Sequence, residues 1–491
     1  MFNFNKIQLF NNTEIEVVNR WFYVISVLFI GLNAFFLLLG FEYFAFSSLL
    51  FVFAWFALFA YDKIYYFILF FTPLSIPLSD FYRLPFDLSI PAEPMMIVLT
   101  GILFVNFIFG KGFKKVYLTN PISISIVVYL VWMFYTSLTS TMPAVSFKFF
   151  LAKIWFIVPM YFFSLKMFEN RKNIFRALWL YIVPLFIVII YTINHHLSYG
   201  LFDKQASHWV MSPFYNDHTS YGAMISMYLP VLFGFLLFEK KDLLRKIPIF
   251  ILLVIFSIAL VLSYSRAAWI SLVLALILGT IIYLKIKFRY LLITGIAILS
   301  VIYIYRFEII DRLEKNRQDS SAELSEHIRS VTNIATDASN LERLNRWNSA
   351  FRMFKEKPFL GWGPGTYMFQ YAPFQMARDK TIISTNFGDG GTAHSEYLSA
   401  LIDSGVGGLI TFLLMIFYIL KSGIIRYHEC KDRNYKILIW SILVGLISYL
   451  IHGFLNNFLD TDKASVPFWT FVAIISVLEI KNPQPGGAED K

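Results

Sequence analysis

The chain has little with which to build a disulfide or a thiolate metal site. Its 491 residues include one cysteine, Cys430, and only 15% of the residues are charged. A single thiol excludes an intramolecular disulfide and a cysteine-based metal centre. The sequence also has no His-x-x-x-His ligand pair, so we expect no metal and no other cofactor. A ligand set of His218, His394 and Glu396 stays open as an alternative.

Apolar residues, by contrast, are abundant: 57% of the chain is hydrophobic, with 54 Phe and 28 Tyr. Apolar runs of about 17–20 residues recur, which is the length that an α-helix needs to cross a bilayer. The predicted fold class is an all-α polytopic membrane protein with about 12–14 transmembrane helices and one long outer loop. The predicted spans are 21–39, 42–60, 63–77, 93–109, 121–138, 149–166, 174–193, 219–238, 247–263, 267–284, 289–305, 396–420, 437–456 and 465–480.

Basic residues are distributed unevenly between the loops that join these spans. With the N-terminus inside, the inner loops carry 18 Lys and Arg residues, and the short outer loops carry 5. This is the positive-inside bias, and it places both ends of the chain in the cytoplasm. The inner loops account for the net charge of +10, so nucleic acid is not an expected partner. No cleavable signal peptide is expected, because a polar start leads directly into a full-length span.

The span pattern divides the chain into four parts. Residues 1–305 would hold helices 1–11, residues 306–395 an outer loop subdomain, residues 396–480 helices 12–14, and residues 481–491 a cytoplasmic tail. An amphipathic helix is predicted near 340–357, where it could lie flat on the membrane or cover the mouth of the helix bundle. Its apolar stripe would consist of Leu341, Leu344, Trp347, Phe351 and Phe354.

Arg266 is the most informative charged residue, because it lies between two apolar runs, 247–262 and 267–284. A permanent cation there is costly in a bilayer unless it faces a cavity, a partner or a ligand. Arg266 therefore marks a candidate site. The alternative is that its side chain extends to the lipid headgroups without any further role.

Other polar residues gather on the same side of the membrane. Seven of the eight histidines, all except His428, fall in outer loops or at outer span ends. Their clustering predicts an outward-facing cavity near Arg266, although each residue alone could be a helix cap, a snorkelling lysine or a hydrogen-bonded helix end. The candidates that accompany Arg266 are Lys148, Lys153, His218, Arg346, His394, Glu396 and His452.

Four motifs in this order resemble the bacterial O-antigen ligase and O-antigen polymerase superfamily. The first is Ser-x-Ser-Arg-x-x-Trp at 263–269. The second extends from Arg346 to Gly365 and ends with Lys-Pro-x-x-Gly-x-Gly-Pro-Gly. The third is Ala-His-Ser-Glu-Tyr-Leu at 393–398, and the fourth is Asp-Ser-Gly-Val-Gly-Gly at 403–408. The first two hundred residues match only in hydrophobic character.

The resemblance implies a glycosyltransferase in the bacterial inner membrane with its active site facing the periplasm. The donor would be a glycan on undecaprenyl diphosphate, and the acceptor a hydroxyl group, with lipid A-core favoured. An O-antigen polymerase or an O-linked protein oligosaccharyltransferase is the alternative within the superfamily. The family works without metal or nucleotide sugar, and its loop Arg and His carry over to Arg266 and His394.

The chemistry of such a transfer fits these residue types. Arg266 would bind the diphosphate through its guanidinium fork, with Lys153 and Arg346 adding positive charge. His394 would act as general base, and direct attack by the acceptor would invert the anomeric configuration. Lys148, His218, Glu396 and His452 would support the site. A transporter of lipid-linked saccharides is the rival class, but such proteins often contain repeats, and none is found in this sequence.

Overall fold

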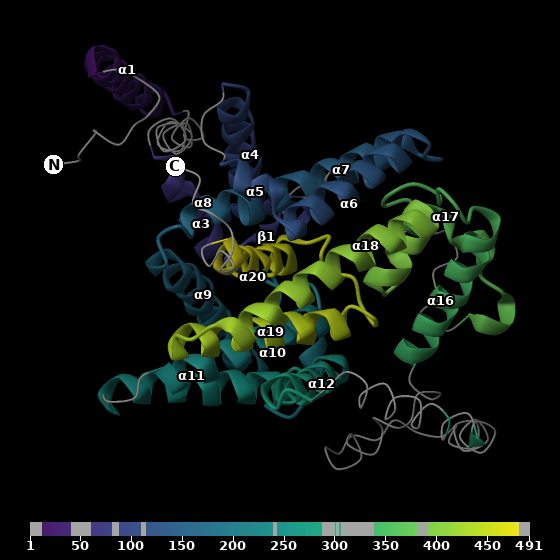
Figure 1. The fold of residues 1–491 in the computed structure, drawn as a ribbon. Coiled ribbons are helices and arrows are strands. Elements are labelled where there is room, and N and C mark those ends of the chain that lie inside the picture. Colours follow the sequence, from purple (N-terminus) through teal and green to yellow (C-terminus); the bar gives the residue numbers. More distant parts are fainter. Residues whose placement is uncertain are drawn as a thin grey trace.

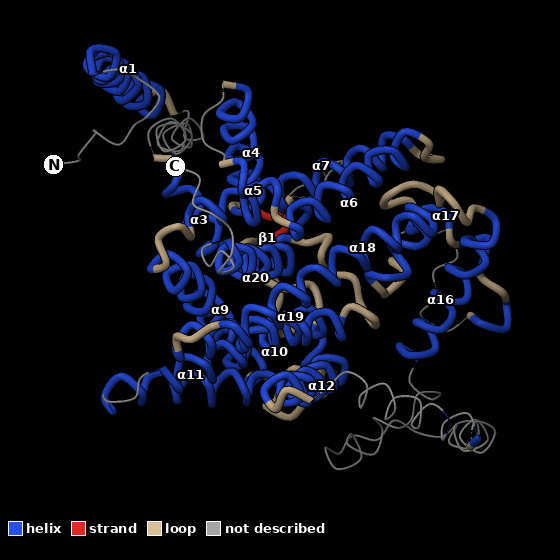
Figure 2. Tube along the Cα trace, in the orientation of Figure 1, coloured by secondary structure: helices blue, strands red, loops and turns tan. Residues whose placement is uncertain are grey.

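The computed structural model describes residues 12–40, 60–80, 88–109, 114–238, 243–286, 300, 304–305, 338–380, 384 and 391–480. Helices dominate these residues, as Figure 2 shows. The strands in this part of the chain are β1 (Ile76–Pro77) and β2 (Ser89–Ile90), which pair antiparallel with Ile76 opposite Ile90. Almost all of the predicted spans 42–60 and 289–305 lie outside the described residues.

Eight helical segments among the described residues are long and apolar enough to cross a membrane, which confirms the predicted all-α polytopic class. One of them, Pro143–Met167, continues without interruption through a π-helical turn that contains Pro159. The eight are α6 (Pro121–Leu138), α7 (Pro143–Ile157) with η5 (Val158–Phe163) and α8 (Ser164–Met167), α9 (Lys172–Leu197), α10 (His218–Phe238), α12 (Arg266–Tyr283), α18 (Glu396–Glu429), α19 (Arg433–His452) and α20 (Asp462–Ile480).

The described residues form further helices and single turns. They are α1 (Asn12–Leu38), α3 (Tyr61–Phe71), α4 (Ala92–Ile108), α5 (Lys115–Thr119), α11 (Leu243–Leu262), α16 (Ala338–Glu356) and α17 (Tyr367–Gln370), with single turns η3 (Thr72–Leu74), η4 (Leu78–Asp80), η6 (Ala206–His208), η7 (Ala372–Phe374) and η8 (Ala377–Asp379). The predicted span 63–77 is shorter than expected. Its helix α3 ends two residues before Pro73, whose ring cannot continue a regular helix.

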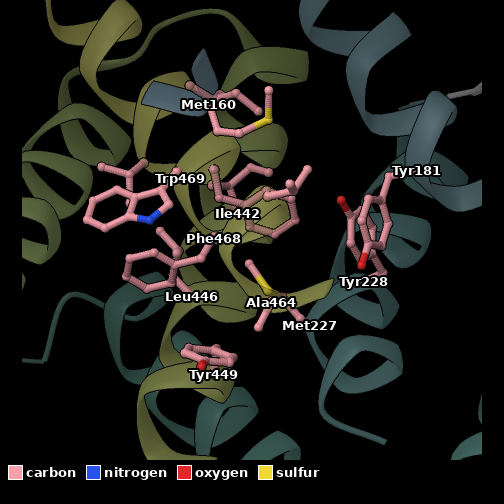
Figure 3. Packing of buried hydrophobic residues seen from close by; sticks show 14 of the residues in the cluster. Met160, Tyr181, Met227, Tyr228, Ile442, Leu446, Tyr449, Ala464, Phe468 and Trp469 are labelled. Atoms are coloured by element: carbon pink, nitrogen blue, oxygen red, sulfur yellow. The ribbon is translucent and has the colours of Figure 1, made fainter. Parts of the chain in front are cut away.

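Helices α10, α19 and α20 form the centre of the bundle (Figure 1), and large apolar side chains fill the space between them (Figure 3). The rings of Tyr181 and Tyr228 stack with centroids 4.7 Å apart. Small residues allow close helix contact, as is common in membrane bundles. A β-carbon at Gly445 of α19 would lie 2.5 Å from the carbonyl oxygen of Met227 in α10.

Helix α18 is interrupted where the glycine-rich turn 361–365 docks onto it. Gly405 has φ 67°, and a β-carbon there would lie 2.1 Å from the carbonyl oxygen of Phe359. The peptide N–H of Trp362 donates to the carbonyl of Ile402 at 2.9 Å. This junction holds the segment that follows α16 against the start of α18.

Helix α16 forms where the sequence predicts it, but it buries a different face. Leu344 and Phe351 of the expected apolar stripe are 42% and 47% exposed. The residues that face inward are Glu342, Asn345, Arg346, Ser349, Ala350 and Met353. Burial of this polar face is possible because its groups bond to one another and to distant segments; Nδ2 of Asn345, for example, donates to Oε1 of Gln375 at 2.7 Å.

Candidate active site

Arg266 is the first residue of α12, and a tight turn fixes its position. Tyr264 adopts φ 50°, a left-handed conformation that is unusual for a bulky residue. Its hydroxyl donates to the carbonyl of Phe202 at 3.0 Å. The hydroxyl of Ser265 caps α12 by accepting from the N–H of Ala268 at 3.4 Å. The chain therefore reverses between α11 and α12 with Arg266 at the end of the helix.

His394 occupies an equivalent place before α18. It also has a positive φ, 48°, and its N–H donates to Oγ1 of Thr392 at 3.3 Å. The hydroxyl of Ser395 then caps α18 by accepting from the N–H of Leu398 at 3.4 Å. Strained backbone of this kind is concentrated at functional sites, and here it lies two residues before Arg266 and at His394 itself.

The helix ends that carry these residues meet at one end of the bundle. The N–H of Glu396 donates to the carbonyl of Gly453 at 2.8 Å, which joins the start of α18 to the end of α19. The preceding residue, His452, contacts the backbone of Ala267 in the first turn of α12. Helix α10 packs there too, since a β-carbon at Gly222 would lie 2.9 Å from that of Ser265.

Arg343 of α16 joins Arg266 at this meeting point. Burial lowers the pKa of Arg343, the charge of Arg266 lowers it further, and the carboxylate of Asp217 opposes both effects. Both guanidinium groups keep their charge at neutral pH. Two such groups in each other's field form an arrangement suited to an anionic ligand.

His394 lies in the same electrostatic neighbourhood. Burial lowers the pKa of His394 to about 4, and the charges of Arg343 and Arg346 contribute to this shift. Asp217 and Glu342 act in the opposite direction. The imidazole is therefore neutral at pH 7 and has a lone pair available to accept a proton. Arg343 interacts electrostatically with both Arg266 and His394, so it connects the two predicted catalytic residues.

His218 and Asp217 form the edge of this cluster at the start of α10. Oδ1 of Asp217 accepts from the N–H groups of Thr219 at 2.7 Å and Ser220 at 2.8 Å, so it caps the helix. The His218 ring lies edge-on to His208, with centroids 4.2 Å apart. Across the described residues, no three His, Cys, Asp or Glu side chains are grouped so as to hold a metal ion.

Lys153 belongs to a separate network. Its Nζ donates to Oδ1 of Asp460 at 2.6 Å and to the carbonyl of Leu459 at 2.8 Å. Glu396 approaches the same loop, where its Oε1 accepts from the N–H of Leu459 and from the hydroxyl of Tyr449, both at 2.8 Å. Lys153 and Glu396 line a cavity of about 30 Å³. The charge of Lys153 is thus compensated within the protein.

Arg346 is buried, and its guanidinium group packs against the chain that precedes His394. Its Nε donates to Oε1 of Glu342 at 2.6 Å, and its guanidinium carbon lies 4.0 Å from the centroid of the Tyr371 ring. Gly391 passes so close that a β-carbon there would lie 1.5 Å from Nη1 of Arg346. Burial favours a higher pKa for Glu342, but hydrogen bonds from Ser384, Arg346 and Asn345 outweigh it and lower the pKa.

The other two predicted residues, Lys148 and His452, lie at the margin of the candidate site. Lys148 is exposed on α7. His452 is buried, and its Nε2 lies 3.0 Å from Nδ2 of Asn456. Sequence reasoning did not single out Arg343 as a site residue. The available signal was the i, i+3 spacing of Arg343 and Arg346, which places them on one face of a helix.

The described helices and the cationic cluster at their ends define a polytopic membrane protein with a candidate anion-binding site. Residues 251–413 match the family model described as O-antigen ligase, and this match confirms the resemblance of the chain to the O-antigen ligase and polymerase superfamily. The matched segment contains Arg266, Arg343 and His394.

A curated relative comes from Haemophilus influenzae, where it is described as an uncharacterized protein. The two sequences are 24% identical over 247 residues, which cover 48% of this chain and 57% of the relative. The chain thus spans little more than half the length of this relative.

Proposed function

We propose that the protein is an O-antigen ligase-like glycosyltransferase. It transfers a glycan from undecaprenyl diphosphate to an acceptor hydroxyl, with lipid A-core as the favoured acceptor, at the periplasmic face of the bacterial inner membrane. The observation that carries the proposal is that the starts of α12 and α18, which carry Arg266 and His394, converge on the end of α19. Arg343 acts electrostatically on both residues, and all three lie within the segment that matches the family model.

Arg266 and Arg343 are the proposed diphosphate ligands. A guanidinium offers two parallel donors to phosphate oxygens, and the contact is strong in a partly desolvated site. Lys153 and Arg346 form ion pairs with Asp460 and Glu342, respectively. We therefore assign Arg346 to positioning of the His394 segment and Lys153 to the adjoining loop, while Lys148, His218, Glu396 and His452 support the site from its edges.

The proposed reaction is a single displacement. The acceptor hydroxyl gives its proton to a ring nitrogen of His394, and its oxygen forms a bond to the anomeric carbon. The bond from that carbon to the phosphate oxygen breaks, and its electron pair leaves with undecaprenyl diphosphate. Arg266 and Arg343 stabilise the charge that develops there. Attack opposite to the leaving group inverts the anomeric configuration.

Diphosphate binding also makes His394 a better base. The charges of Arg343 and Arg346 contribute to the lowered pKa of His394. A bound dianion offsets those charges, so the pKa of His394 rises towards its ordinary value of about 6.5 when the donor is present. The base thus gains proton affinity when the acceptor proton has to be removed.

The test is transfer by the purified full chain. The protein in lipid nanodiscs would be incubated with an undecaprenyl-diphosphate saccharide and, separately, with lipid A-core, a second lipid-linked saccharide or a hydroxyl-bearing peptide. The proposal predicts that lipid A-core gains the mass of the glycan. A gain in the second or third acceptor identifies a polymerase or a protein-glycosylating enzyme. Movement of the donor between leaflets with no new glycosidic bond contradicts enzymatic function.

A further inference from the structure

A second cationic site lies at the other end of the bundle. A cleft of about 700 Å³ opens between α10, α12 and α19 and the end of α18. Three basic residues line it: Lys285 just beyond α12, and Arg433 and Lys436 in the first turn of α19. Its walls include Leu237, Ile437 and Trp440. None of these residues belongs to the candidate active site.

The cleft and the candidate active site are at opposite ends of the same two helices. Helix α12 runs from Arg266 to Tyr283, and α19 runs from Arg433 to His452. Eighteen helical residues extend about 27 Å, which is close to the thickness of a bilayer's hydrocarbon core. If the active site faces the periplasm, the cleft lies at the headgroup level of the cytoplasmic leaflet.

The basic residues of the cleft form no ion pair with the described carboxylates near them. Nζ of Lys436 lies 5.1 Å from the centroid of the Tyr427 ring, while Lys285 and Arg433 are exposed. The nearby acids are engaged elsewhere: Oδ1 of Asp432 accepts from the N–H of Tyr435 at 2.9 Å, and Glu429 pairs with Arg426 at 2.9 Å. Among the described residues, no carboxylate forms an ion pair with any of the three cations.

The walls of the cleft are apolar and rigid. Nε1 of Trp440 donates to the carbonyl of Gly279 at 2.9 Å, which fixes the indole ring against α12. A β-carbon at Gly279 would lie 3.2 Å from this ring, so the contact is close. Leu237 is 40% exposed beside it. A soluble anion would leave these surfaces uncovered, whereas the acyl chains of a lipid would cover them.

We propose that this cleft binds an anionic phospholipid of the cytoplasmic leaflet. Lys285, Arg433 and Lys436 contact the phosphate, and the acyl chains extend along Leu237, Ile437 and Trp440. Basic pockets between transmembrane helices on the cytoplasmic side are suited to anionic headgroups, and tryptophan is favoured at this depth. The proposed site is separate from the glycan-transfer site and does not depend on the transfer reaction.

Native mass spectrometry of the full chain, delipidated in detergent, would measure the affinity of this site for added lipids. Phosphatidylglycerol is expected to bind at least about tenfold more tightly than phosphatidylcholine with the same acyl chains. The double substitution Lys285→Gln/Lys436→Gln should weaken phosphatidylglycerol binding about tenfold or more. The matched pair Lys421→Gln/Lys431→Gln removes the same charge from exposed positions near the same end of the bundle and should leave the affinity unchanged.

Leu237→Trp tests the apolar wall without changing the charge. It should narrow the cleft beside the apolar wall and weaken phosphatidylglycerol binding. This variant provides the test if the double Gln variant fails to fold. Equal affinity for the two lipids, or an equal loss in the Lys421/Lys431 control, would overturn the proposal. Complete displacement of phosphatidylglycerol by millimolar inorganic phosphate would do so too, because the cleft would then recognise phosphate alone.

Discussion

Nε of Arg346 donates to Oε1 of Glu342 at 2.6 Å, and both side chains lie on the buried face of α16. The guanidinium also contacts Tyr371 and Gly391, three residues before His394. This ion pair thus links the fold of α16 to the position of the proposed base.

Glu342→Ala should destabilise the protein strongly. It leaves the buried charge of Arg346 without its partner, and breaking such a pair typically costs about 3–5 kcal/mol. Thermal unfolding in detergent should show a clear decrease in Tm. Glu342→Ala/Arg346→Met removes both charges and should recover a large part of the stability. Wild-type stability of Glu342→Ala would show that the pair does not hold α16.

The pKa of His394 sets the acid limit of the reaction. The neutral imidazole is the active form, and the lowered pKa of about 4 keeps it neutral well below pH 6.5 in the free protein. We expect kcat/KM for the donor to fall only below about pH 5, since this parameter reports the enzyme before the donor binds. The acid limb of kcat should lie at higher pH, because the bound diphosphate offsets the nearby arginines. An acid limb of kcat/KM at pH 6.5 would contradict this environment for His394.

Arg343 should influence the same titration. Removal of its charge by Arg343→Gln takes away one cause of the lowered pKa of His394, so the acid limb of kcat/KM should move to higher pH. The same substitution should reduce kcat/KM about 10²–10³-fold through loss of a charged diphosphate ligand. Lys355→Ala, which removes an exposed charge from the same helix, is the control and should change neither property.

Gly405→Ala should disrupt the junction between α18 and the glycine-rich turn. Its φ of 67° is strained for alanine, and the new β-carbon would lie 2.1 Å from the carbonyl oxygen of Phe359. The strained conformation alone costs about 1–3 kcal/mol. Limited proteolysis should cut the 358–365 segment faster than in the wild type. An unchanged cleavage rate would show that the junction tolerates a side chain.

The sequence predicted the helical class and the location of α16, because apolar run length and helix stop signals are local properties. It did not predict which face of α16 is buried. Glu342 accepts a hydrogen bond from Ser384, and Asn345 donates one to Gln375; these partners lie 42 and 30 residues away. The partner of Lys153, Asp460, is 307 residues away. Such pairings depend on how the helix ends meet, and hydrophobic periodicity carries no information about them.

Single-turnover transfer tests the central claim most directly. Donor and acceptor would be mixed with excess wild-type protein, Arg266→Ala, His394→Ala or the control His428→Ala, which changes the histidine near the opposite end of α18. The account predicts wild-type rates for the control and losses of about 10²–10⁴-fold for the other two variants, the range for removal of a general base or a charge-stabilising donor. Near wild-type transfer by folded Arg266→Ala and His394→Ala would contradict it.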